Sequence, residues 1–205
     1  MTQSSNLVFT DIVLKIPRWL PELLPLADHV FTSDEEKMAL AITLAEKNIT
    51  QGGGPFGAIL VDSHSGKLVS AGVNQVVASC CSVAHAEIMA IMLGQKCHHT
   101  FNLSDIGQIE LISSAEPCAQ CFGAIPWSGV CRIVCGARAE DTETIGFDEG
   151  PKPHDWVTQL EQRHISVTRD ILRREACAVL QTYKAAGFVV YNGTLKEIES
   201  GTLKK

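Results

Sequence analysis

Two short segments of the sequence contain residues that could hold a metal ion. One reads His-x-Glu, at His85 and Glu87, and the other reads Pro-Cys-x-x-Cys, with Cys118 and Cys121. A catalytic Zn²⁺ usually has three nitrogen or sulfur ligands and a water in the fourth position, whose pKa falls to about 7. The histidine and the two cysteines can supply those ligands. Glu87 is close enough to take a proton from the water without being a ligand itself.

Both segments are expected at the start of a helix. Pro117 suits the first helical position, which would place Cys118 and Cys121 one turn apart on the same helix face. The positive end of the helix dipole lowers the pKa of a thiol there and favours metal binding. His85 shortly precedes the apolar run 88–93, so a second helix is expected to begin beside it. Two helix N-termini that face one ion would make a compact site.

Other cysteines allow a competing interpretation. Cys131 and Cys135 follow the Cys-x-x-Cys pair, so four thiolates could form a structural zinc site. They lie in a β-branched apolar run, however, where a free cysteine behaves as a small hydrophobic side chain. A structural site would also give the His-x-Glu segment no purpose. The catalytic arrangement is therefore preferred, and the remaining cysteines are interpreted as incidental or as core residues: Cys80, Cys81, Cys97 and Cys177.

The composition favours one globular domain with a large hydrophobic core. The chain has 205 residues, of which 45% are hydrophobic, and a formal net charge of −6. Binding to phosphates normally needs a basic face, so the acidic balance argues against a nucleic-acid partner. The eight cysteines are not spaced like a disulfide framework, which favours metal binding in a reducing cytosol. We expect a cytoplasmic protein without a signal peptide or a membrane span.

Alternating helix and strand patterns indicate an α/β fold. A capping box at Ser33 and Glu36 predicts a helix that ends near Gly52. The segment 1–32 contains several prolines and is expected to be an extended arm on a hydrophobic surface. The remaining predicted elements are strands at 58–61, 67–71, 108–112, 131–135 and 165–167, and helices after His85, after Pro117, near 154–163 and at 172–186.

Three further residues have no compelling function by residue type and spacing alone. Asn74 ends a predicted strand and is typical of a turn. Trp127 follows the cysteine helix and is typical of a core aromatic residue. Glu149 precedes Gly-Pro, where acidic residues are common in plain turns.

The sequence resembles the cytidine deaminase-like superfamily of zinc deaminases over about residues 35–192. The pattern H-x-E…P-C-x-x-C is the signature of that superfamily. Within it, the chain is most similar to the guanine deaminase branch. The residues that carry this narrower resemblance are Gly53-Gly54-Pro55-Phe56-Gly57-Ala58, Asn74, Trp127 and Gly146-Phe147-Asp148-Glu149.

The resemblance implies a three-layer α/β/α sandwich with a central mixed five-stranded sheet. The chain would divide into an arm at 1–32, a catalytic domain at 33–192 and a polar tail at 193–205. The implied reaction is the hydrolytic deamination of guanine to xanthine and ammonia, with one Zn²⁺ in each subunit. His85, Cys118 and Cys121 would be the metal ligands.

The resemblance also implies functions for residues that surround the metal. Glu87 would act as general acid and base, and Glu149 would be a second proton shuttle. Many relatives have aspartate at that second position, so the longer glutamate is a departure. The substrate contacts would come from Asn74 and the backbone of Ala86 at the purine edge, and from Phe56 and Trp127 against the ring.

The implied partners are a small purine and a second copy of the chain. The family is dimeric, and a C-terminal segment closes over the substrate, in some members from the neighbouring subunit. Tyr191 is the candidate for that contact.

Other functions remain compatible with the metal motif. The substrate could be cytosine, guanosine or a triazine amine, since only the shape of the pocket would separate these. A tRNA adenosine deaminase has the same motif, but it would need a basic face. A zinc protein without catalytic activity would have no use for Glu87.

Overall fold

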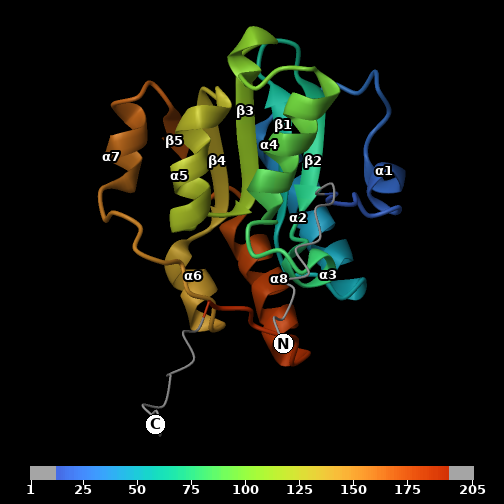
Figure 1. Ribbon diagram of the computed structural model, residues 1–205, viewed down its shortest axis with the longest axis vertical. Helices are drawn as coiled ribbons and strands as arrows, with labels where there is room; N and C mark the ends of the chain where they lie inside the picture. The colour runs from blue at the N-terminus through green and yellow to red at the C-terminus, as the bar shows by residue number, and fades with distance from the viewer. Residues whose placement is uncertain (1–12, 194–205) are drawn as a thin grey trace, which may run out of the picture.

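The computed structural model describes residues 13–193 and forms three layers around one β-sheet (Figure 1). Five strands lie in the order β2-β1-β3-β4-β5 within this part of the chain. β1 is antiparallel to both β2 and β3, whereas β3, β4 and β5 run parallel. The strands are β1 (Gly57–Asp62), β2 (Lys67–Val73), β3 (Ile109–Ala115), β4 (Arg132–Ala137) and β5 (Ser166–Thr168). The predicted mixed sheet is therefore confirmed.

Helices cover both faces of the sheet. On one face, α2 (Asp34–Thr50) and α8 (Arg173–Ala185) pack over one core cluster. On the other face lie α4 (Ala86–Cys97) and α5 (Ala119–Ser128), which Figure 1 shows in front of the sheet, and α7 (Trp156–Glu161). α5 and α7 are the crossovers that parallel strands require, because such strands cannot be joined by a tight hairpin. These helices and strands agree with those predicted by the sequence, and the three-layer sandwich is confirmed.

The remaining elements are short. They are α1 (Leu20–Leu23), α3 (Val76–Ser79), the 3₁₀ helix η1 (Leu103–Asp105) and α6 (Ala139–Thr144). Each spans too few residues to show a helical period in the sequence. Within residues 13–193, no helix has the length and apolar character that a membrane crossing requires.

The capping box at the start of α2 is only partly as predicted. The Ser33 hydroxyl accepts a hydrogen bond from the Glu36 amide at 3.2 Å, as an N-cap should. The Glu36 carboxylate, however, accepts from the amide of Thr32 at 2.8 Å rather than from Ser33. The helix start is therefore stabilised from both sides of the cap.

Residues 13–32 lie beside the first core cluster and are not wholly extended. Leu20 and Phe31 are buried in that cluster, and the Phe31 amide donates to the Gly66 carbonyl at 2.8 Å. One helical turn, α1, interrupts the segment, with Pro21 among its first residues, where a missing N–H costs nothing. Residues 1–12 and most of the predicted polar tail lie outside the described residues.

Two glycines allow helices to approach the sheet closely. A Cβ atom at Gly57 would lie 2.3 Å from the Ala41 carbonyl oxygen of α2. A Cβ atom at Gly72 would lie 2.3 Å from the Ala86 carbonyl oxygen, in the first turn of α4. Since no larger residue fits there, Gly72 determines how near the start of α4 comes to the sheet.

Candidate active site

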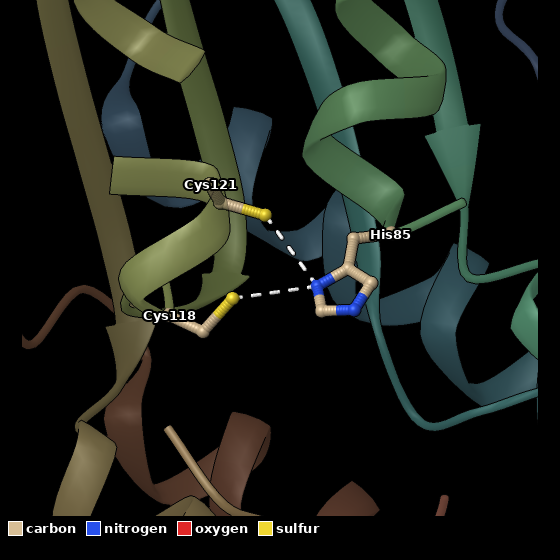
Figure 2. Close-up of side chains that lie close together, drawn as sticks. All are labelled: His85, Cys118 and Cys121. Carbon is tan, nitrogen blue, oxygen red and sulfur yellow. Dashed lines mark hydrogen bonds between the residues drawn. The ribbon is translucent and has the colours of Figure 1, made fainter. Parts of the chain in front are cut away.

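The three predicted metal ligands come together at two helix N-termini (Figure 2). His85 is the N-cap of α4, Cys118 is the N-cap of α5, and Cys121 lies in the first turn of α5. The prediction that Pro117 occupies the first helical position is wrong. Cys118 has extended backbone angles, so the helix begins at Ala119 and the proline precedes the cap.

The distances between the ligand atoms fit a tetrahedral zinc ion. Nδ1 of His85 lies 3.4 Å from Sγ of Cys118 and 3.5 Å from Sγ of Cys121. Bond lengths of about 2.3 Å to sulfur and 2.0–2.1 Å to nitrogen at a tetrahedral angle give about the same separation. Figure 2 shows the imidazole with Nδ1 turned toward both sulfur atoms. Among residues 13–193, no second group of this kind is formed, so Cys131 and Cys135 do not make a four-cysteine site.

A hydrogen bond between the two ligand thiols shifts their pKa values in opposite directions. A hydrogen bond from Cys121 lowers the pKa of Cys118 to about 4, and the same contact raises the pKa of Cys121. Cys118 therefore favours the thiolate, which is the form that binds a metal.

Glu87 is a buried carboxylate next to the ligands. It lies in the first turn of α4 and is 6% exposed. Burial raises its pKa, and the negative charge of Cys118 adds to this effect. A carboxylate with a raised pKa is suited to both accepting and donating a proton near neutral pH.

A cavity of about 380 Å³ opens beside the ligands. Its volume is in the range typical of small-molecule sites. Seven of the ten predicted site residues line it: Phe56, Asn74, His85, Glu87, Cys118, Glu149 and Tyr191. The side chains of Cys121 and Ala86 are buried and are not among the lining residues.

Glu149 brings a second buried carboxylate to this cavity. Burial raises its pKa to about 8, and the charge of Cys118 acts in the same direction. Its Oε2 atom is buried without a hydrogen-bond partner among the described residues, and so is the Tyr191 hydroxyl. Unsatisfied buried polar groups are rare in native proteins and costly. Both atoms belong to residues that line the cavity, so a ligand there could satisfy them.

Comparison with known proteins identifies the family. The sequence model of the cytidine and deoxycytidylate deaminase zinc-binding region matches residues 31–137. The chain belongs to this deaminase family. It is accordingly a zinc-dependent hydrolytic enzyme, and the donor set at His85, Cys118 and Cys121 fits its cofactor.

Several known deaminases are similar to this chain. A solved structure of a guanine deaminase from Nitrosomonas europaea is 44% identical and superimposes with a TM-score of 0.81, covering 85% of this chain and 97% of that one. Guanine deaminase of Bacillus subtilis is 37% identical over 53% of this chain and 67% of its own length. A tRNA-specific adenosine deaminase of Haemophilus influenzae is 32% identical over 73% of this chain and 82% of its own length.

Aromatic side chains form one wall of the deaminase cavity. The ring of Phe56 lies edge-on to Phe147 with centroids 5.2 Å apart, and Phe147 lies edge-on to Tyr191 at 4.9 Å. Phe147 was not assigned to the site from the sequence. It follows a glycine in a turn, and no local pattern indicated that its ring would point inward.

The C-terminal segment of the deaminase lies over its own cavity. Tyr191, Asn192 and Gly193 are among the lining residues. The Asn192 side chain accepts from the Asp148 amide at 2.9 Å and donates to the Gly146 carbonyl at 2.8 Å. Asn192 thus ties this segment to the turn that carries Glu149, which no sequence signal indicated.

Trp127 is not brought to the cavity of its own chain. It lies on α5 and is 84% exposed, whereas Ile125 on the same helix is fully buried against the sheet. The expectation that Trp127 covers the substrate ring, and the alternative that it is a core aromatic, are both at odds with this placement. The inner face of α5 is occupied by smaller residues, so the indole points outward.

Proposed function

We propose that this chain deaminates guanine with water to give xanthine and ammonia. The observation that carries the proposal is the buried, unpartnered Oε2 atom of Glu149 at the cavity. An ionised carboxylate is an acceptor with two oxygens and can bind two adjacent donors. Burial raises the pKa of Glu149, but two donors from a bound ligand would favour the ionised form. Guanine offers such a pair in N1–H and its 2-amino group. Cytosine and adenine place an acceptor beside the amino group, so neither matches the carboxylate in the same way.

Two carboxylates divide the proton transfers. When bound by His85, Cys118 and Cys121, zinc would supply an acidified water. Glu87 accepts the proton of the attacking water and delivers it to N3 of guanine as the water oxygen bonds to C2. Glu149 contacts N1 and the 2-amino group, and it helps transfer the second proton of the water, which the C2 hydroxyl loses as it becomes a carbonyl, to the amino nitrogen. The bond from C2 to that nitrogen then breaks, so that ammonia leaves and xanthine remains.

The rest of the cavity would orient the purine. The Asn74 side chain and the backbone at Ala86 are proposed to bond the edge of the ring. Asn74 is fixed for this purpose, because its main-chain carbonyl accepts a hydrogen bond of 2.8 Å from Asn48. Phe56 would lie against the ring, together with Phe147 and Tyr191. The overall similarity to guanine deaminases supports the same assignment.

The proposal is tested by the release of ammonia from a panel of amino substrates. The panel contains guanine, guanosine, cytosine, a triazine amine and a tRNA anticodon stem-loop with adenosine. We expect kcat/KM for guanine to exceed that for every other substrate by at least tenfold. A higher value for the stem-loop would identify a tRNA deaminase, and ammonia from none of the substrates would indicate a zinc protein without catalytic activity.

We also infer that the protein forms a homodimer through the face that carries Trp127. Phe101 is 85% exposed, and it neighbours Asn102, which lies against Gly129 at the end of α5. Two large exposed aromatic residues near one helix end favour a protein contact. Light scattering should give twice the mass of the chain, with Trp127→Glu reducing it to one chain. Leu26→Glu, at an equally exposed apolar residue of the arm, serves as the control.

The cytoplasmic location stays a proposal. It is supported by the eight cysteines, which all lie within the described residues and are all free.

A further inference from the structure

We propose that Lys152 is a positioning residue that holds the loop of Glu149 against the segment that supplies Cys118. The inference rests on the function proposed for Glu149. Lys152 does not line the cavity, so it acts through its neighbours rather than on the substrate.

Lys152 connects the two segments directly. Its Nζ atom donates to the Pro117 carbonyl at 2.9 Å and lies 3.6 Å from Oε2 of Glu116. Both acceptors immediately precede Cys118 in the chain. The lysine side chain is 8% exposed, so these contacts are shielded from solvent, unlike a typical surface ion pair.

The acceptor Glu116 is itself held in place. Its side chain is 2% exposed, and Oε1 accepts from Nε of Arg169 at 2.6 Å. Its other oxygen accepts from the amide of Ala139 at 3.2 Å. Lys152 is therefore attached to a point that is fixed by β4, α6 and the segment after β5.

The ring of Trp156 also contacts this cation. Nζ of Lys152 lies 4.9 Å from the ring centroid, and the guanidinium carbon of Arg169 lies 5.7 Å from it. Trp156 is buried at the start of α7. A desolvated contact of this kind adds a cation–π attraction to the hydrogen bond, so the lysine has one well-determined position.

This anchor matters because the Glu149 loop has little regular structure. Residues 146–155 form no helix or strand. The main chain of Glu149 meets α5 through one bond, from the Ala119 amide to the Glu149 carbonyl at 2.8 Å. Asn192 ties the start of the loop to the C-terminal segment, and Lys152, three residues after Glu149, adds a second bond to the segment at the start of α5. A displacement of about 1 Å at a reacting group can lower the rate by about 10²-fold. Loss of the Lys152 contacts should therefore displace the Glu149 carboxylate and lower kcat.

A double-mutant cycle tests the inference. Lys152→Met removes the cation and its hydrogen bond but keeps an apolar side chain of similar length. We expect kcat for guanine to fall by about 10- to 100-fold with bound zinc unchanged. In a Glu149→Gln background, the same substitution should lower kcat by less than about twofold, because the group it positions is already removed.

Equal losses of kcat in both backgrounds would show that Lys152 contributes only to general stability, and an unchanged kcat would also overturn the inference. Lys184→Met is the matched control, since Lys184 also donates to a carbonyl, that of Thr144, away from the cavity. It should leave kcat and KM unchanged. If Lys152→Met does not fold, Lys152→Gln enters the same cycle. Wild-type turnover by Glu149→Gln alone would contradict the proposed function and, with it, this inference.

Discussion

The two ends of the cavity are built in different ways. At the metal end, all three ligands lie at the N-termini of α4 and α5, whose buried residues pack against the sheet. The rest of the lining, the loop end of the cavity, comes from loops, including those of Phe56, Asn74 and Glu149. The Glu149 loop is bonded to α5 beside Cys118, so the two ends adjoin. Helices therefore position the metal ligands that are common to the family. The side chains proposed to determine substrate specificity lie in loops, and contacts between those loops hold them in place.

The same comparison distinguishes the expected consequences of substitution. A change at the metal end should reduce turnover of every substrate, because the same ligands serve each of them. A change at the loop end should alter substrate preference, KM or the fit of the purine while zinc remains bound. The following predictions test this division, beginning with the largest expected effect.

Loss of one ligand should have the largest effect. Cys118→Ala leaves two protein ligands, too few for a catalytic zinc site. We expect the purified variant to contain less than a tenth of the wild-type zinc and to release no measurable ammonia from guanine. Cys177→Ala, at a cysteine outside the site, should keep both zinc and activity. Full zinc content in Cys118→Ala would mean that the ligand set is wrong.

Glu87→Gln should be nearly as severe while leaving the metal in place. The amide is of similar size but cannot accept the proton of the attacking water. A general acid and base contributes about 10²–10⁴-fold, so kcat should fall by about that factor for all substrates. Metal analysis and steady-state kinetics measure the two quantities. Turnover at the wild-type rate would remove Glu87 from the mechanism.

Glu149→Gln should impair guanine turnover without affecting zinc binding. The amide group places a donor where guanine also has donors, so kcat/KM for guanine should fall by about 10²-fold or more. Zinc content should not change. Glu143→Gln, in the exposed part of the nearby α6, is the control. If both variants retain wild-type rates, Glu149 is an ordinary turn residue.

The same substitution should stabilise the zinc-free protein at alkaline pH. The pKa of Glu149 is raised from 4.5 to about 8 by burial, so folding favours its protonated form. This contribution to stability is fully present below pH 4.5 and is lost as the pH rises toward 8. Urea unfolding should therefore show Glu149→Gln to be more stable than wild type at pH 8.5, with little difference near pH 4. An equal difference at both pH values would contradict this prediction.

Asn48→Ala should have the smallest effect and act mainly on binding. Asn48 is buried on α2, and its Nδ2 atom donates to the carbonyls of Gly54 and Asn74, each at 2.8 Å. Its loss leaves these acceptors unsatisfied, which should destabilise the protein by about 1–3 kcal/mol. We expect KM for guanine to rise by about tenfold and kcat to change little, since the metal end is untouched. Asn102→Ala removes a turn-forming asparagine elsewhere and should leave KM unchanged. A fall in kcat with KM unchanged would contradict the separation of the two ends.

The metal ligands could be predicted from the sequence because their motifs depend on local spacing. A Cys-x-x-Cys pair at a helix start places both thiols at the same end, whatever packs around them. Strand and helix positions followed from hydrophobic periodicity for the same reason. One local error concerned Pro117, because Cys118 has extended backbone angles and the helix begins at Ala119. The bond predicted from Ser33 to the Glu36 carboxylate comes from Thr32 instead.

Only the tertiary structure decided the other end of the cavity. Asn48, the loop of Glu149 and Lys152, and Asn192 are distant from one another in the sequence. Their bonds to Asn74, Pro117 and Asp148 follow no period or motif. The burial that leaves Oε2 of Glu149 without a partner depends on all of these segments at once. Trp127 shows the same limit, because the packing of α5 on the sheet turned its side chain outward. A local pattern can specify which atoms bind a metal, but the shape of a pocket is set by contacts between remote parts of the chain.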